Sequence, residues 1–144
     1  MKNIAEILDG VKTMGIGGHV RPDGDCVGSC MALYLYVKTY WPEIQVDVYL
    51  DHPKPVFGHI DCMDEIKMEL DGEKEYDLLV TCDVSAKDRL AIAAPYFDSA
   101  KKTACIDHHV SNPGFAQINH IQGEVSSACE VLYGLLDPEK INCT

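Results

Sequence analysis

Three groups of acidic and histidine residues could hold metal ions together, although they lie far apart in the sequence. The first group belongs to the segment His-Val-Arg-Pro-Asp-Gly-Asp at positions 19–25, and the other two follow apolar runs. The acidic and histidine side chains of the three groups are those of His19, Asp23, Asp25, Asp83, Asp107, His108 and His109. Carboxylates and imidazoles without thiolates suit Mn²⁺ or Mg²⁺ better than structural zinc, because oxygen-rich ligand sets favour harder cations.

Two divalent ions held in this way would give phosphoesterase chemistry. Ions about 3.5–4 Å apart can clamp a phosphoryl group, lower the pKa of a bridging water and stabilise the leaving oxygen. Asp83 could bridge the two ions. Without a metal, so many clustered carboxylates would repel one another. The pattern therefore predicts a two-metal centre.

Each group by itself also has an ordinary structural explanation. Pro-Asp-Gly-Asp at 22–25 is a common turn sequence. Asp83 could cap a following helix, and His108 and His109 could lie in a polar loop. What favours a shared site is that all three groups follow predicted strands.

Short apolar runs alternate with helical patterns along the chain. We expect strands at residues 14–19, 44–50, 76–82, 103–106 and 116–119. We expect helices at residues 3–11, 27–40, 64–70, 87–94 and 126–136, with caps at Asn3 and at Ser126 or Ser127 and a break at Pro95. We expect no element in the tail from residue 137 onward.

This alternation predicts an α/β fold with a mainly parallel β-sheet flanked by helices. The 144 residues, 47% of them hydrophobic, fit one domain spanning 1–144. In such sheets ligands bind beyond the carboxyl ends of the strands, so topology brings distant residues to one rim.

Composition excludes several classes of partner. Twelve basic residues against 23 acidic ones give a net charge of −11, which argues against a surface that wraps long duplex nucleic acid. The sequence shows no signal peptide and no apolar run long enough to span a membrane. A phosphorylated substrate remains compatible with this charge if metal ions supply the local positive field.

The seven cysteines do not follow a zinc-binding or disulfide pattern. There is no Cys-x-x-Cys pair, and the nearest two, Cys26 and Cys30, are one helical turn apart. Cys82 and Cys105 lie inside apolar runs, as buried free thiols do. We interpret all of them as structural thiols of a reduced, cytoplasmic protein.

The motifs resemble those of the DHH phosphoesterase superfamily over essentially the whole chain. They are His-x-x-Pro-Asp-x-Asp at 19–25, Asp83 after an apolar strand, and Asp-His-His at 107–109. The spacing and the closing segment Glu-Val-Ser-Ser-Ala-Cys-Glu at 124–130 are most similar to the nanoRNase and 3′-phosphoadenosine-5′-phosphate (pAp) phosphatase branch. The resemblance implies a DHH domain with three α/β/α layers.

The resemblance also implies a ligand set for two Mn²⁺ ions, with Mg²⁺ as an alternative. One ion would be held by His19, Asp23 and Asp83. The second would be held by Asp25, Asp83 and His108.

Further roles follow from the same resemblance. Asp83, His108 and His109 would carry the catalysis, and His109 would meet the substrate phosphate. Asp107 would orient the site from behind the ligands. Arg89 matches an arginine often found after the second motif and would support the ligands, although a plain surface arginine explains it equally well.

Family members carry two features that we do not find in residues 1–144. One is a fourth motif, an aspartate that completes the second metal site. The other is a C-terminal domain that binds substrate across a cleft. We therefore expect an N-terminal metal domain truncated before the fourth motif, with weak or no activity of its own. A free sheet edge could pair two copies into a homodimer.

The function that fits best is hydrolysis of short oligonucleotide phosphodiesters, nucleotide 3′-phosphates such as pAp, or other small phosphate esters by a metal-activated water. One alternative is a manganese-dependent inorganic pyrophosphatase-like domain, which would share the metal motifs. Another is a non-catalytic domain that binds metal or nucleotide.

Overall fold

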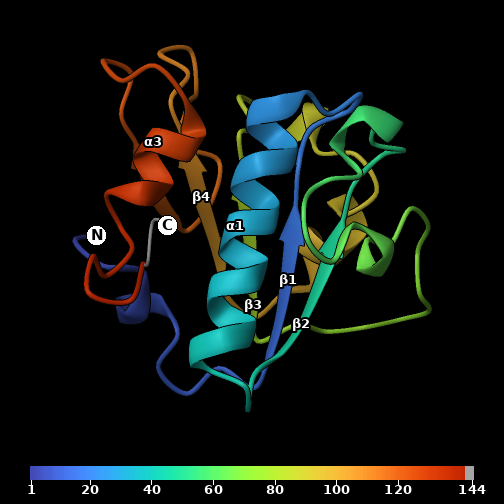
Figure 1. The fold of residues 1–144 in the computed structure, drawn as a ribbon. Helices are drawn as coiled ribbons and strands as arrows, with labels where there is room; N and C mark the ends of the chain where they lie inside the picture. The colour runs from blue at the N-terminus through green and yellow to red at the C-terminus, as the bar shows by residue number, and fades with distance from the viewer. Residues whose placement is uncertain (142–144) are drawn as a thin grey trace.

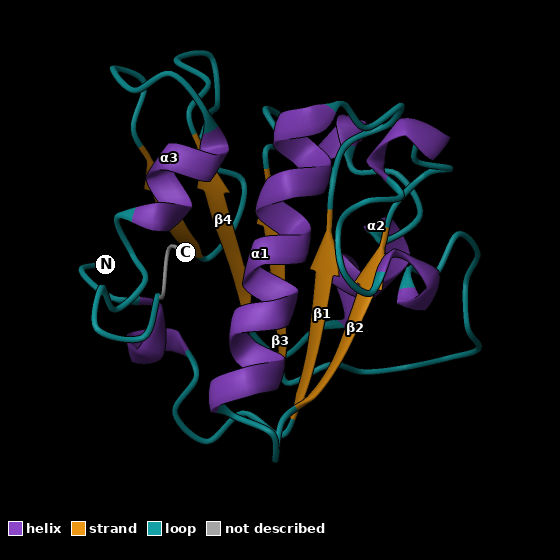
Figure 2. Ribbon diagram, in the orientation of Figure 1, coloured by secondary structure: helices purple, strands orange, loops and turns teal. Residues whose placement is uncertain are grey.

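A computed structural model describes residues 1–141 and contains one five-stranded sheet whose strands all run parallel. Figures 1 and 2 show its arrangement. The strands are β1 (Thr13–Gly17), β2 (Gln45–Tyr49), β3 (Leu78–Cys82), β4 (Thr103–Asp107) and β5 (Ile118–Ile121). Their order across the sheet is β2-β1-β3-β4-β5. The predicted α/β fold is confirmed.

Helices cover both faces of this sheet. The long helix α1 (Gly24–Tyr40) and the short helix α3 (Ala128–Tyr133) lie side by side on the face that Figure 1 presents. Helix α2 (Ala94–Ser99) packs behind the sheet (Figure 2). Four 3₁₀ turns complete the list: η1 (Ile4–Ile7), η2 (Pro55–Phe57), η3 (Met63–Glu65) and η4 (Lys87–Arg89).

The central strand β3 shows why the sheet needs cover on both sides. Its five residues are all buried, and successive side chains point to opposite faces. Leu78 and Val80 belong to the apolar core shared with α1, whereas Leu79 belongs to the core that contains Tyr96 and Phe97 of α2. A continuous apolar run of this kind is typical of a central parallel strand.

Helix α1 ends where the sequence predicts but begins three residues earlier, at Gly24 rather than at Val27. The Asp23 side chain caps it by accepting hydrogen bonds from the backbone N–H groups of Asp25 and Cys26. The helix ends at Tyr40, directly before Trp41 and Pro42, because a proline disfavours helix in the residue before it. This places the segment 19–25 at one end of the longest helix.

The predictions for the shorter helices were partly wrong. The expected helix at 3–11 is only the 3₁₀ turn η1, although Asn3 and Glu6 form the capping box at its start. Gly10, with a φ of 72°, turns the chain away before a second helical turn can form. The helix expected at 64–70 is replaced by the turn η3, which ends at Glu65.

Pro95 does not break a helix. The predicted helix at 87–94 is only the turn η4, and α2 starts at Ala94 with Pro95 in its first turn. A proline is tolerated there because the first N–H groups of a helix have no partner within the helix. The proline therefore marks the start of α2 rather than an end.

The C-terminal elements were predicted with shifted bounds. Strand β5 begins two residues later than expected, and α3 is shorter than the predicted 126–136 helix. Ser127 caps α3 by accepting a hydrogen bond from the N–H of Glu130. Residues 137–141 contain no helix or strand, as expected, and the rest of the tail lies outside the described residues.

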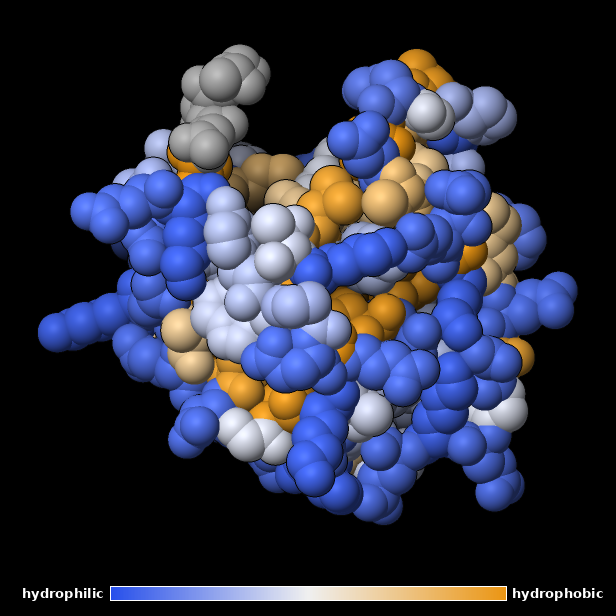
Figure 3. All heavy atoms as spheres, turned by 60° about the horizontal axis from the view of Figure 1, so that its bottom comes forward, coloured by the Kyte–Doolittle hydropathy of each residue, from blue (hydrophilic) through white to orange (hydrophobic). Residues whose placement is uncertain are grey.

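Figure 3 presents the end of the sheet at which the strands begin. Hydrophilic side chains cover most of the face at the amino ends of the strands, with small apolar patches between them (Figure 3). None of the helices within residues 1–141 has the length and apolarity that would be needed to cross a bilayer. The groups singled out from the sequence all lie at the opposite, carboxyl end.

We predict that Gly18→Ala destabilises the fold. A Cβ atom at Gly18 would overlap with the Sγ of Cys26 and the Cδ2 of Leu50, both of which are fully buried. Overpacking of this kind costs about 1–3 kcal/mol. Urea denaturation should show a loss of that size, whereas Gly24→Ala, where a Cβ atom has ordinary contacts, should keep the wild-type free energy of unfolding within about 0.5 kcal/mol. Equal midpoints for the two variants would contradict the prediction.

Candidate metal centre

The strand order opens a crevice at the carboxyl edge of the sheet. The chain leaves β1 for β2 on one side, and β3 pairs with β1 on the other side, so the order reverses between β1 and β3. Open α/β sheets bind ligands at such a point. His19 follows β1 by two residues, Asp83 directly follows β3, and the neighbouring strand β4 ends at Asp107.

His19 is 9% exposed and presents one ring nitrogen to the crevice. Its Nδ1 lies 2.7 Å from the carbonyl oxygen of Val20, which can only accept, so Nδ1 donates, and loss of the second proton to a bound cation would leave the Nε2 lone pair for that cation. That Nε2 lies 3.4 Å from Oδ2 of Asp83 and 3.7 Å from Oδ1 of Asp23. A neutral imidazole in this tautomer is a suitable metal ligand.

Asp83 lies at the centre of the site. It is 3% exposed, and its φ of 59° turns the carboxylate out of the line of β3. Oδ1 is buried without a hydrogen-bond partner, 3.5 Å from Nε2 of His108 and 3.7 Å from Nδ1 of His109. Burial raises the pKa of Asp83, while the Asp83 carboxylate raises the pKa of His19 to about 11. A buried carboxylate oxygen without a partner is costly unless a cation compensates it.

Two sets of donor atoms in residues 1–141 are compact enough to share an ion. In each set all donor atoms lie within 4.8 Å of one another; the sets are His19, Cys26 and Asp83, and Asp83, His108 and His109. Two ligand atoms that each bind one ion at about 2.0–2.3 Å are at most about twice that distance from each other. The spacing within each set therefore suits a single ion. Asp83 belongs to both sets, and its unpartnered oxygen supports a divalent cation there, so the residues fit the predicted metal.

Asp25 links the site to the start of helix α3. Its two carboxylate oxygens accept hydrogen bonds from the backbone N–H groups of Ala128 and Cys129, at 2.8 and 2.9 Å. Oδ2 also lies 3.5 Å from Nε2 of His108. Asp25 therefore fixes the start of α3 beside His108. Asp23, by contrast, has a side chain that is 68% exposed.

Asp107 holds His109 in place. The Asp107 side chain is completely buried and accepts hydrogen bonds from Nδ1 of His109 and from Nδ2 of Asn112, both at 2.7 Å. Nε2 of His109 is then left with a lone pair. Sequence reasoning did not single out Asn112, although an asparagine five residues after a predicted buried acid was a usable signal.

A hollow of about 510 Å³ lies over these side chains. It is lined by His19, Asp23, Asp25, Asp83, Ser85, Arg89, His108, His109, Ser126 and Ser127. The structure thus brings every predicted metal-binding side chain to one hollow, with Asp107 behind it. Arg89 is exposed at the rim, and its carbonyl oxygen accepts a hydrogen bond from the N–H of Val20. Sequence reasoning did not connect Ser85, Ser126 or Ser127 with this lining.

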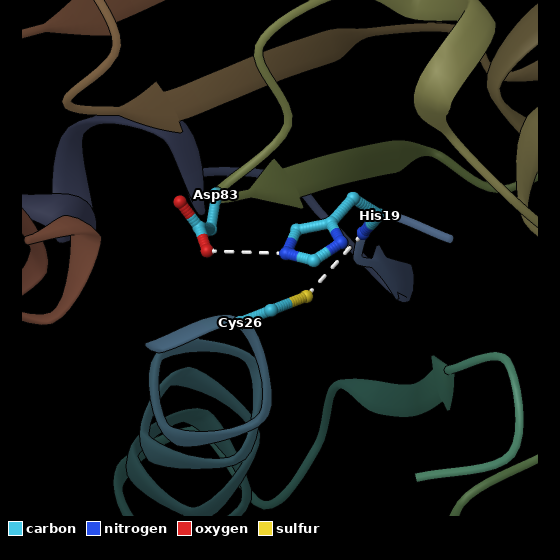
Figure 4. Close-up of side chains that lie close together, drawn as sticks. All are labelled: His19, Cys26 and Asp83. Carbon is cyan, nitrogen blue, oxygen red and sulfur yellow. Dashed lines mark hydrogen bonds and ion pairs between the residues drawn. The ribbon is translucent and has the colours of Figure 1, made fainter. Parts of the chain in front are cut away.

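Cys26 is a further residue of the site that sequence reasoning missed. Its sulfur lies beside the imidazole of His19 and the carboxylate of Asp83, on the side of α1 (Figure 4). Sγ accepts a hydrogen bond of 3.3 Å from the backbone N–H of His19. A buried cysteine next to an Asp-x-Asp segment resembles ordinary core packing in sequence, so only the fold reveals this position.

Comparison with known proteins agrees with these motifs. The family model "DHH family, N-terminal domain" matches residues 13–143. The bifunctional oligoribonuclease and PAP phosphatase NrnA of Bacillus subtilis is 28% identical over 117 residues, which are 81% of this chain and 36% of that protein. The protein of the same name from Thermus thermophilus is 25% identical over 138 residues, which are 95% of this chain and 40% of that protein.

A solved structure supports the fold. An exopolyphosphatase-related protein from Bacteroides fragilis superimposes with a TM-score of 0.81 at 22% identity, covering 91% of this chain and 41% of that protein. The chain thus spans about two fifths of the length of the relatives that it matches. Since the family model covers nearly all of its residues, the chain belongs to the DHH family and corresponds to that family's N-terminal domain.

Proposed function

We propose that this chain is the metal-binding domain of a phosphoesterase that hydrolyses short oligonucleotide phosphodiesters or nucleotide 3′-phosphates such as pAp. The observation that carries the proposal is the buried, unpartnered oxygen of Asp83 between His108 and His109, at the floor of an open polar hollow. The names of the Bacillus and Thermus relatives support this class of substrate.

Two Mn²⁺ ions are the proposed cofactors, and Mg²⁺ fits the same oxygen-rich ligands. His19, Asp23 and Asp83 hold one ion. Asp25, Asp83 and His108 hold the other. When bound, the ions supply Lewis-acid chemistry: they balance the charge on the phosphoryl oxygens and make water a better nucleophile.

The remaining side chains act on the substrate. Because Asp107 binds Nδ1 of His109, the Nε2 atom of that ring is available to contact the substrate phosphate. Arg89 at the rim adds a permanent positive charge beside the acidic ligands. These contacts orient an anionic substrate over Asp83.

A second hollow beside Asp23 favours a nucleotide over pyrophosphate. It has a volume of about 400 Å³ and is lined by Arg21, Pro22, Asp23, Gly24, Asp51, His52, Lys54 and Phe57. The Phe57 ring lies over the start of α1, 3.6 Å from where a Cβ atom on Gly24 would lie. An aromatic face next to Arg21 and Lys54 suits a base with its phosphate, because bases stack on aromatic rings and cations bind phosphate.

Among the tests of the proposed function, the first prediction concerns activity. With Mn²⁺, the purified 144-residue chain should release phosphate from pAp, or a mononucleotide from a 5′-phosphorylated dinucleotide, faster than phosphate from pyrophosphate. We expect slow turnover, since the matched residues span only 36–40% of the length of the Bacillus and Thermus relatives. Chelation should abolish it. Faster cleavage of pyrophosphate would favour the pyrophosphatase alternative, and stoichiometric Mn²⁺ or nucleotide binding without any turnover would favour a non-catalytic domain.

The second prediction concerns metal binding. Mn²⁺ at 100 times its Kd should stabilise the wild-type chain by about 2.7 kcal/mol. Asp83→Asn should lose this stabilisation because it removes the carboxylate proposed to be shared by both ions, and without metal it should unfold at a lower temperature because it breaks the ion pair with His19. Thermal denaturation with and without Mn²⁺ measures both effects. Asp9→Asn, an exposed residue before β1, should behave like the wild type. Stabilisation retained by Asp83→Asn would contradict the proposed ligand set.

The third prediction concerns the base. Phe57→Leu keeps an apolar side chain but removes the aromatic face, and a stacking contact contributes about 1–3 kcal/mol per base. Calorimetric titration with Mn²⁺ present should show at least about fivefold weaker binding of adenosine 5′-monophosphate and unchanged binding of inorganic phosphate. Val56→Ala, which alters an exposed neighbour, is the matched control. Equal losses for both ligands would argue against a base subsite at Phe57.

A further inference from the structure

A sulfur atom lies on the buried side of the proposed metal centre. The Sγ of Cys26 belongs to the compact set with the donor atoms of His19 and Asp83, and all three residues are buried. Figure 4 shows the thiol next to the imidazole and the carboxylate, with α1 beneath it. The motif resemblance assigns to this ion only imidazole and carboxylate ligands.

The position of this sulfur is closely constrained. Cys26 is completely buried in the first turn of α1, and its Sγ accepts the N–H of His19. The sulfur occupies space that Gly18 leaves open, since a Cβ atom at Gly18 would overlap with it. The thiol therefore stays beside the ligands instead of rotating into the core.

A comparison with Cys30 separates this role from ordinary core packing. Cys30 follows one helical turn later and is equally buried. It is absent from both compact donor sets of residues 1–141. Burial alone therefore does not place a thiol at the centre.

Asp23 is far more exposed than Cys26. Its side chain is largely exposed, and its Oδ1 accepts the N–H groups of Asp25 and Cys26. It does not belong to the compact set that contains His19 and Asp83. A metal ion bound by His19 and Asp83 thus has the sulfur of Cys26 as a nearby third donor.

We propose that the Cys26 thiolate is a further ligand of the metal ion at His19 and Asp83. This inference rests on the proposed metal centre. Binding replaces the S–H bond by an S–metal bond, and the proton passes to solvent. A thiolate in the first turn of a long helix is also stabilised by the helix dipole. Because thiolates are soft ligands, Cys26 increases the affinity of this site for Cd²⁺ or Zn²⁺ more than its affinity for Mn²⁺.

The test uses a spectroscopic signal that depends on the sulfur. Cd²⁺ is titrated into the 144-residue chain, and the ultraviolet absorbance of cadmium–thiolate charge transfer is followed for the wild type and for Cys26→Ser, Cys26→Ala and Cys30→Ser. The wild type and Cys30→Ser should give a saturable band. Both Cys26 variants should lack it and bind Cd²⁺ at least about tenfold more weakly, while their affinity for Mn²⁺ changes by less than about threefold.

Several results would overturn the inference. They are a band that persists in both Cys26 variants, a band lost in Cys30→Ser instead, or no band in the wild type. Circular dichroism shows whether each variant is folded. If Cys26→Ser is unfolded, the result for Cys26→Ala decides the test. Mn²⁺ stabilisation without a cadmium band would reject the sulfur ligand and keep the proposed function, whereas a cadmium band together with faster cleavage of pyrophosphate than of pAp would keep the sulfur ligand and reject the proposed substrate class.

Discussion

The buried carboxylate of Asp83 imposes the strongest physical constraint on this structure. It directly follows the central strand, in a left-handed backbone conformation, and one of its oxygens has no hydrogen-bond partner. A carboxylate in that position is unfavourable in an apolar surrounding, so the groups around it must compensate the charge. Imidazoles from the loops after β1 and β4 lie close to this carboxylate. The strand order places β1 and β4 on either side of β3, which brings those loops together.

Much of this arrangement could be predicted from the sequence. Apolar runs that stop at Asp83 and Asp107 identify two parallel strands, and parallel strands place their ends at one edge. Residues 19–25 could be placed at the same edge because a helical pattern follows them at once. Strand ends therefore carried most of the information about the site.

The rest depends on contacts between distant residues. Pro95 starts a helix because of its place in a first turn, which the proline itself does not reveal. The hydrogen bonds from α3 to Asp25 and the position of Cys26 beside His19 require the complete fold. Burial is visible in sequence as apolar periodicity, whereas the direction of a buried polar atom is set by packing. The sequence therefore indicated that Cys26 is buried, but it did not indicate that the sulfur lies next to His19 and Asp83.

The bond between Asp25 and the start of α3 has a consequence for biosynthesis. The carboxylate of residue 25 finds its backbone donors at residues 128 and 129, so more than a hundred residues separate the partners. Such long-range contacts form late, because their loop-closure entropy must be overcome first. During translation residues 19–25 leave the ribosome well before residues 128 and 129. The growing chain therefore completes the contact between Asp25 and α3 only after synthesis has passed α3.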